Sequence, residues 1–100
     1  MLIPATIKIG STPFTVYQPR YSPMKGTYGA INYTLGTIHV AKRCPYGDKL
    51  RTPRQRSETF WHEVVHGILF DMDSPLHKDE RFVTLFAMLL SNAINSARFE

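Results

Sequence analysis

The second half of this 100-residue chain carries the strongest constraint on its fold, a stretch whose local signals all favour a helix. Thr52 precedes Pro53, and Gln55 stands where its side chain can reach back to the amide of Thr52, which is the pattern of a capping box. From Pro53 to about Asp71 no residue disfavours a helix except Gly67. Apolar residues recur here at helical spacing, namely Phe60, Trp61, Val64, Val65, Ile68 and Leu69. The sequence therefore predicts a long and largely buried helix.

A second helix is predicted after a short connection. Ser74 and Pro75 repeat the pair of N-cap and first-turn proline, so this helix begins at Pro75 or Lys78 and continues to about Ser96. Its apolar residues are almost continuous: Phe82, Val83, Leu85, Phe86, Met88, Leu89, Leu90, Ala93, Ile94 and Ala97. Because the connection is short, we expect the two helices to fold back antiparallel as an αα-hairpin.

The first half of the chain alternates as strands do. Residues 6–9 and 14–17, separated by Gly-Ser-Thr-Pro, predict one β-hairpin, and residues 29–33 and 37–41 predict another. The expected fold class is α+β, with a small, mostly antiparallel sheet packed on the αα-hairpin in one domain of residues 1–100.

Residues 62–66, His-Glu-Val-Val-His, lie in the middle of the first predicted helix. His62 and His66 are four positions apart and project from one face, so both rings can bind a single metal ion. Glu63 then lies beside the ion, where a carboxylate can take a proton from zinc-bound water during hydrolysis of a carbonyl compound. The pattern predicts a Zn²⁺ site with His62 and His66 as ligands and Glu63 as the catalytic residue.

The predicted hairpin indicates a third ligand. If the chain turns at Asp73, His66 lies seven residues before the turn and Glu80 seven residues after it, at about the same height. Glu80 is therefore the expected third ligand, and a set of two histidines and one glutamate leaves the fourth coordination position for water. A metzincin is excluded, because Leu69 and Met72 stand where its glycine and third histidine would be. The alternative third ligands are His77, Asp71, Asp73 and Asp79.

These residues resemble the ImmA/IrrE-type zinc metallopeptidases, in particular the short versions found in bacteriophages and prophages. That family reads His-Glu-x-x-His on one helix and Glu-x-x-Ala-Asn-x-Phe-Ala-x-x-Leu-Leu on the next. The positions that match are Glu80, Phe86, Ala87 and Leu90. Val65 departs from the small residue that is frequent in the family, and Val83-Thr84 replaces Ala-Asn. The resemblance covers residues 52–91 well and the first half only as a layout of strands.

The resemblance implies a cytoplasmic gluzincin that hydrolyses peptide bonds of an intracellular protein, such as a phage or host regulator. By analogy with zincins, the edge strand beside the metal would hold the substrate as an added strand, and residues 37–41 are the expected edge. A donor to the tetrahedral intermediate is expected among His77, His39 and Tyr33. For His39 the simpler expectation is a histidine on the exposed face of a strand.

Composition favours an intracellular protein. Cys44 is the single cysteine and cannot form an internal disulfide, the first residues lack the pattern of a signal peptide, and no apolar run is long enough to span a membrane. The net charge is +4, with a basic cluster formed by Lys42, Arg43, Lys49, Arg51, Arg54 and Arg56. No nucleic-acid-binding motif accompanies this cluster, so we expect a solvated surface or an acidic protein partner instead of nucleic acid.

Two other interpretations compete with the peptidase. One is a non-catalytic, zinc-stabilised module that binds a protein. The other has no metal, and the two histidines merely pack between the helices. Burial of two imidazoles and two carboxylates without an ion is costly, which argues against the second alternative.

Overall fold

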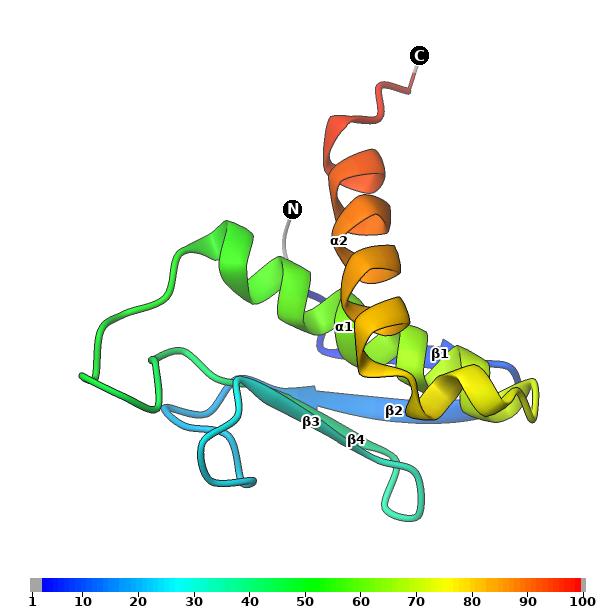
Figure 1. The fold of residues 1–100 in the computed structure, drawn as a ribbon, viewed down its shortest axis with the longest axis horizontal. Helices are drawn as coiled ribbons and strands as arrows, with labels where there is room; N and C mark the ends of the chain where they lie inside the picture. The colour runs from blue at the N-terminus through cyan, green and yellow to red at the C-terminus, as the bar shows by residue number, and fades with distance from the viewer. Residues whose placement is uncertain (1–2, 100) are drawn as a thin grey trace.

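The computed structural model describes residues 3–99, and the chain has an α+β fold with a four-stranded sheet (Figure 1). The strands are β1 (Thr6–Ile9), β2 (Thr12–Tyr17), β3 (Gly29–Asn32) and β4 (Thr37–Val40). The helices are α1 (Pro53–Asp71), the 3₁₀-helix η1 (Pro75–Lys78) and α2 (Glu80–Ser96). Figure 1 shows α1 lying across one face of the sheet, with α2 rising from the opposite side of α1. The predicted strands and the first helix are confirmed to within two residues at each end.

The strand order is β1-β2-β4-β3, which makes the sheet mixed. The two antiparallel hairpins are confirmed, and β2 and β4 join them by a parallel pairing in which Val16 lies opposite Ile38. The prediction that residues 37–41 form the edge is wrong, because this parallel pairing places β4 inside the sheet. The edge on this side is β3.

The capping box fixes the start of α1. The Thr52 hydroxyl accepts a hydrogen bond from the Gln55 amide at 3.1 Å, and the Gln55 side chain accepts one from the Thr52 amide at 2.9 Å. Pro53 occupies the first helical position, as the sequence predicts. From this start the helix runs without interruption to Asp71, so residues 62–66 fall on its middle turns.

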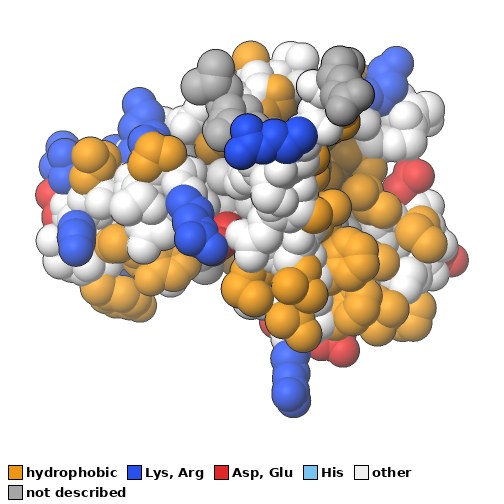
Figure 2. All heavy atoms as spheres, turned by 90° about the horizontal axis from the view of Figure 1, so that it is seen from above, with side chains coloured by type: hydrophobic (Ala, Val, Ile, Leu, Met, Phe, Trp, Pro, Cys, Tyr) orange, Lys and Arg blue, Asp and Glu red, His pale blue; other side chains and the backbone are white. Residues whose placement is uncertain are grey.

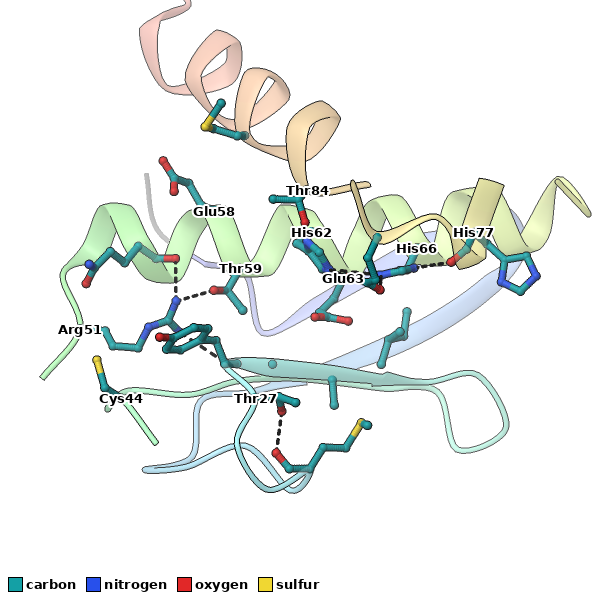
Figure 3. Close-up of a pocket in the computed structure, with 18 of the residues that line it drawn as sticks. Thr27, Cys44, Arg51, Glu58, Thr59, His62, Glu63, His66, His77 and Thr84 are labelled. Carbon is teal, nitrogen blue, oxygen red and sulfur yellow. Dashed lines mark hydrogen bonds and ion pairs between the residues drawn. The ribbon is translucent and has the colours of Figure 1, made fainter. Parts of the chain in front are cut away.

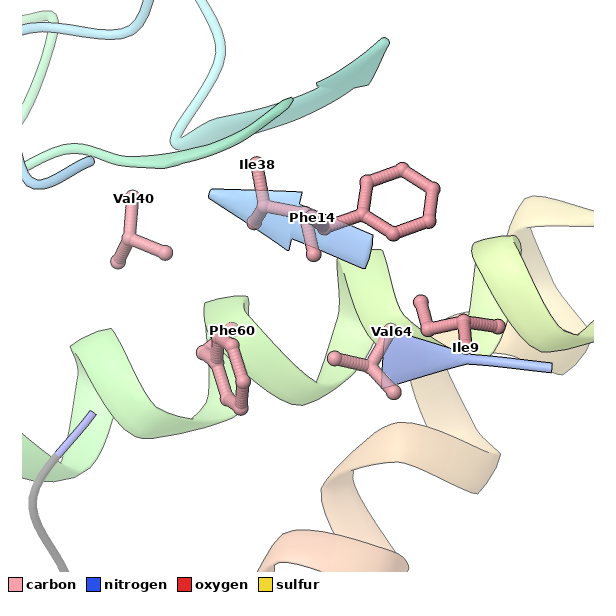
Figure 4. Packing of buried hydrophobic residues seen from close by; sticks show 6 residues of the cluster. All are labelled: Ile9, Phe14, Ile38, Val40, Phe60 and Val64. Carbon is pink, nitrogen blue, oxygen red and sulfur yellow. The ribbon is translucent and has the colours of Figure 1, made fainter. Parts of the chain in front are cut away.

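The main core lies between the sheet and α1 (Figure 4). It consists of Ile9, Phe14, Ile38, Val40, Phe60 and Val64. Gly67 lets the sheet approach the helix closely: a Cβ atom there would stand 2.7 Å from Cδ1 of Ile9 and 3.0 Å from Cδ1 of Ile31. The sheet and α1 are therefore held at a fixed separation by close packing.

A second, smaller core joins α1 to α2. It contains Val65, Leu69, Val83 and Ala87. Beside it lie the buried hydroxyl groups of Ser57 and Ser91, which are 3.4 Å from each other. The contacts between the two helices follow an antiparallel order, since Glu80 lies beside His66 and Ser91 beside Ser57. Figure 1 shows α2 inclined to α1. The chain is redirected twice before α2 begins, since Ser74 caps η1 and Asp79 caps α2. The two helices thus pack in the antiparallel order that the sequence predicts, but they are inclined to each other and η1 lies between them.

Candidate metal centre

The two histidines of residues 62–66 face each other on adjacent turns of α1. Their ring centroids lie 4.8 Å apart, and the Nε2 atoms of His62 and His66 are separated by 3.2 Å. His66 is buried and His62 is half-buried. The i, i+4 spacing thus brings two ring nitrogens to one point at the helix surface.

Glu80, the first residue of α2, brings a carboxylate to the same point. Its oxygens lie 2.7 Å from Nε2 of His66 and 3.2 Å from Nε2 of His62. The three side chains thus offer ligand atoms that lie within 4.8 Å of one another. Because α2 runs back along α1, its first turn lies beside the middle of α1, and this places Glu80 where the counting along the sequence predicts it.

The spacing of these atoms suits a small tetrahedral ion. Zinc bonds of about 2.0–2.1 Å to nitrogen and oxygen place neighbouring ligand atoms roughly 3.3 Å apart. The two Nε2 atoms are 3.2 Å apart, which matches this value. Glu80 approaches His62 through Oε2 at 3.2 Å and His66 through Oε1 at 2.7 Å. The donor set of two imidazoles and a carboxylate also suits zinc.

The hydrogen bond at the far side of His66 supports a cation between these groups. Its Nδ1 lies 2.7 Å from the carbonyl oxygen of His77, and a carbonyl only accepts, so Nδ1 carries the proton. In the neutral ring Nε2 then presents a lone pair toward the Glu80 carboxylate. Two lone pairs at 2.7 Å repel each other unless a proton or a metal ion lies between them.

His62 is held in the form that a metal requires. Burial lowers its pKa, and the nearby His66 lowers this pKa further, while Glu80 raises it. The ring is therefore neutral near pH 7, and its Nε2 is directed toward His66 and Glu80. One cation at the centre of the cluster would satisfy all three side chains at once.

The alternative third ligands do not reach the cluster. Figure 3 shows the ring of His77 turned away from His66, and this ring packs edge-on against Phe70 with centroids 5.5 Å apart. Asp79 caps α2 by accepting a hydrogen bond from the Phe82 amide at 3.0 Å. In residues 3–99 the cluster of potential ligands contains only His62, His66 and Glu80, without Asp71 or Asp73.

Glu63 projects from α1 toward β3 and lies beside the cluster (Figure 3). Its side chain is 7% exposed. Burial, with a further contribution from the charge of Glu80, raises the pKa of Glu63 to about 8. A carboxyl group with a pKa near neutrality can both accept and release a proton under physiological conditions.

A cleft of about 840 Å³ opens between α1 and the edge strand β3. Gly29, Ala30 and Ile31 line one wall, and Thr84 and Met88 of α2 lie at its rim. The three clustered side chains and Glu63 all line this cleft. The candidate metal centre is thus open to a ligand of peptide size and lies beside a strand with a free edge.

The three candidate donors to the tetrahedral intermediate, His39, Tyr33 and His77, differ in their position relative to the cleft. The simpler expectation for His39 is confirmed, because its neighbours Ile38 and Val40 face the core. His39 projects from the opposite face of the sheet and stacks on Tyr17. Tyr33 lines the cleft and stacks on Phe70, with ring centroids 4.0 Å apart.

Burial raises the pKa of Tyr33, and the charges of Glu63 and Glu80 raise it further. Its hydroxyl therefore keeps its proton and remains a donor at neutral pH. His77 contributes a backbone carbonyl to the site, while its ring lies at the margin of the cleft.

The sequence did not indicate Arg51 as part of the site. Arg51 is 6% exposed and lines the cleft, where it hydrogen-bonds to Thr59, which lies one helical turn before Glu63. Its other partners are the carbonyls of Tyr28, Ala41 and Gln55. Within residues 3–99 no carboxylate forms an ion pair with it. The expectation that the basic cluster is either solvated surface or a partner-binding patch is therefore wrong for Arg51, whose charge is buried among backbone carbonyls.

No protein-family profile, curated protein or solved structure matches this chain. The resemblance to ImmA/IrrE-type peptidases rests on the residues of α1 and α2 alone. Within residues 3–99 neither helix has the length and apolar character that a membrane span requires.

Proposed function

We propose that this protein is a zinc metallopeptidase with a minimal zincin-like site, which hydrolyses peptide bonds of an intracellular protein. His62, His66 and Glu80 are the proposed zinc ligands, and Glu63 is the proposed catalytic residue. The observation that carries the proposal is the convergence of three ligand atoms beside a buried carboxyl group in an open cleft. The same arrangement is expected from the resemblance to ImmA/IrrE-type peptidases.

The chemistry that zinc supplies in such a site is activation of water and polarisation of a carbonyl group. Glu63 takes a proton from the attacking water as the water oxygen bonds to the peptide carbonyl carbon. Glu63 then gives this proton to the amide nitrogen as the carbon–nitrogen bond breaks. The raised pKa of Glu63 suits both transfers near neutral pH.

Two further groups support this chemistry. The carbonyl of His77 fixes the ring of His66 with its Nε2 toward the cluster. Tyr33, whose hydroxyl stays protonated, is the cleft residue that we assign as donor to the carbonyl oxygen of the substrate.

A peptide is the substrate class that the shape of the site favours. The cleft follows β3, whose outer edge carries backbone groups that no other strand in residues 3–99 pairs. An extended peptide could add to this edge as a further strand and pass in front of Glu63. This edge replaces residues 37–41 as the proposed binding strand.

Glu63→Gln separates catalysis from metal binding. We expect this variant to keep its zinc and to lose peptide hydrolysis by about 10²–10⁴-fold. Glu58→Gln is the matched control, because Glu58 also lines the cleft but pairs with Arg54 at 3.4 Å, away from the cluster. Cleavage of a peptide library, with and without a chelator, is followed by mass spectrometry, and zinc is measured in the same samples.

The outcomes distinguish the proposal from its alternatives. Loss of cleavage in Glu63→Gln with zinc retained supports the proposal, as does unchanged cleavage in Glu58→Gln. Equal zinc loss in Glu63→Gln and Glu80→Ala contradicts the assigned roles. Bound zinc without cleavage of any peptide contradicts the peptidase and favours the alternative function, a non-catalytic module that binds protein.

A further inference from the structure

The outward side of α2 is apolar although nothing in residues 3–99 covers it. Leu85, Phe86 and Leu89 are 54%, 49% and 56% exposed, while the helix packs on α1 through Val83, Ala87 and Ser91. Figure 1 shows α2 rising away from the rest of the molecule, and Figure 2, which looks down on it from its C-terminal end, shows hydrophobic side chains gathered over this part. Contiguous exposed apolar surface of this kind marks an interaction site.

The spacing of this surface indicates that its occupant is a helix. An outer stripe runs along α2 with intervals of four, three, four and three residues, and it consists of Phe82, Phe86, Leu89, Ala93 and Ser96. This is the spacing of the a and d positions of a coiled coil, whose side chains pack into the holes of a second helix. Phe82 and Phe86 already stack on each other, with ring centroids 5.6 Å apart.

The charges along α2 allow a second copy of the chain to be that helix. No charged residue occurs from Phe82 to Ala97, although the chain carries a net charge of +4. A second α2 therefore brings no like charges into the contact. The start of α2 adds no net charge, because Lys78 and Arg81 balance Asp79 and Glu80.

Side-chain size favours a second copy in an antiparallel arrangement, because the outer stripe is complementary to itself. The large residues of the outer stripe lie in its first half, and the small Ala93 and Ser96 lie in its second half. When two copies pair antiparallel about Leu89, Phe82 of one copy meets Ser96 of the other, and the large half of each stripe covers the small half of its partner. A contact that uses the same surface on both subunits is the usual two-fold arrangement of homodimers.

We propose that the outer stripe of α2 is a homodimerisation surface, on which two copies of this chain pair antiparallel about Leu89. The stripe lies on the side of α2 away from Thr84 and Met88, which line the cleft. Both clefts of the dimer would therefore remain open. This inference does not depend on zinc or on catalysis.

The first test is the mass of the protein in solution, by analytical ultracentrifugation from roughly 1 to 200 μM, because association depends on protomer concentration. We expect the mass to rise toward twice the 11.5 kDa of one chain. Leu89→Glu, which places two carboxylates at the two-fold axis, is expected to stay monomeric with an unchanged circular dichroism spectrum. Leu35→Glu is the control, since Leu35 is 73% exposed in the turn between β3 and β4, and it is expected to dimerise as the wild type does.

The second test distinguishes the arrangement, by oxidative cross-linking of single cysteines in a Cys44→Ser background. Leu89→Cys is expected to cross-link to itself, and Phe82→Cys is expected to cross-link only when mixed with Ser96→Cys. A wild type that is monomeric over the whole concentration range overturns the proposal and leaves the stripe to a different partner. Dimerisation of Leu89→Glu, or self-cross-linking of Phe82→Cys, overturns it equally.

Discussion

Gly29 and Glu63 lie so close together that no side chain fits between them. A Cβ atom on Gly29 would stand 3.2 Å from Oε2 of Glu63, 2.6 Å from Cγ2 of Thr59 and 2.9 Å from the carbonyl oxygen of His39. Two of these neighbours are side chains of α1, and the third is the backbone of β4. The bare backbone of β3 at Gly29 therefore leaves the space in which the proposed catalytic carboxyl group lies.

Gly29→Ala should damage both stability and hydrolysis. The added methyl group has to displace a carbonyl of the sheet, and we expect a loss of about 1–3 kcal/mol in the free energy of unfolding, measured by urea denaturation. Peptide cleavage should fall more than zinc content, because Glu63 is displaced while the ligands are not. Gly67→Ala is the control for crowding alone, since its methyl group meets the ends of Ile9 and Ile31 and does not meet Glu63. It should therefore affect stability more than hydrolysis. A Gly29→Ala variant as stable and as active as wild type would show that the contact is not constraining.

The free energy of unfolding of the metal-free protein should fall as the pH rises. Glu63 has a folded pKa of about 8 against an ordinary value of 4.5, so the folded protein holds a proton that the unfolded chain releases. The resulting stability is complete below about pH 4.5 and is lost as the pH rises toward 8, by up to about 1.4 kcal/mol per pH unit. Denaturation at a series of pH values in a chelator measures this slope.

His62 contributes with the opposite sign. Its lowered pKa makes stability rise with pH until its ordinary value of 6.5 is passed, so the slope due to Glu63 is clearest between pH 6.5 and 8. Glu63→Gln has no group to titrate there and should lose this slope. An equal slope in Glu63→Gln and the wild type would mean that another group is responsible.

His77→Ala should leave zinc binding nearly intact. The group that orients His66 is the backbone carbonyl of His77, which remains when the ring is removed. Loss of a side chain that orients a metal ligand costs about 10–100-fold in affinity, and we expect a change smaller than tenfold here. Competition titration with a zinc-binding dye measures it, and His66→Ala shows the effect of a lost ligand. A loss in His77→Ala as large as that in His66→Ala would identify His77 as a ligand itself.

The secondary structure follows from local signals in the sequence. The capping box at Thr52 places the start of α1, and alternation places each strand to within two residues. Local patterns do not reveal which strand of one hairpin pairs with which strand of the other. The parallel pairing of Val16 with Ile38 joins residues that are distant in the chain, and it alone moves β4 from the edge to the interior.

The candidate site was partly predictable for the same reason. His62 and His66 are related by helix geometry, and Glu80 is placed by a short connection, so few conformational choices separate the three. Arg51 could not be found in this way, because its environment consists of carbonyls from Tyr28, Ala41 and Gln55, and carbonyl positions are not encoded by residue type. His39 lies on the outer face of the sheet, as the simpler expectation has it, but alternation alone could not say which face the helices cover.

The measurement that most directly tests the central claim is the zinc content and zinc affinity of the purified protein and its Glu80→Gln variant. Because the Glu80 carboxylate completes the cluster with His62 and His66, we expect one zinc ion per chain in the wild type and an affinity at least about tenfold weaker in Glu80→Gln. Glu58→Gln, which alters a carboxylate at the wall of the same cleft, should bind zinc as the wild type does. A wild type that binds no zinc, or a Glu80→Gln variant that binds it with unchanged affinity, would contradict the account.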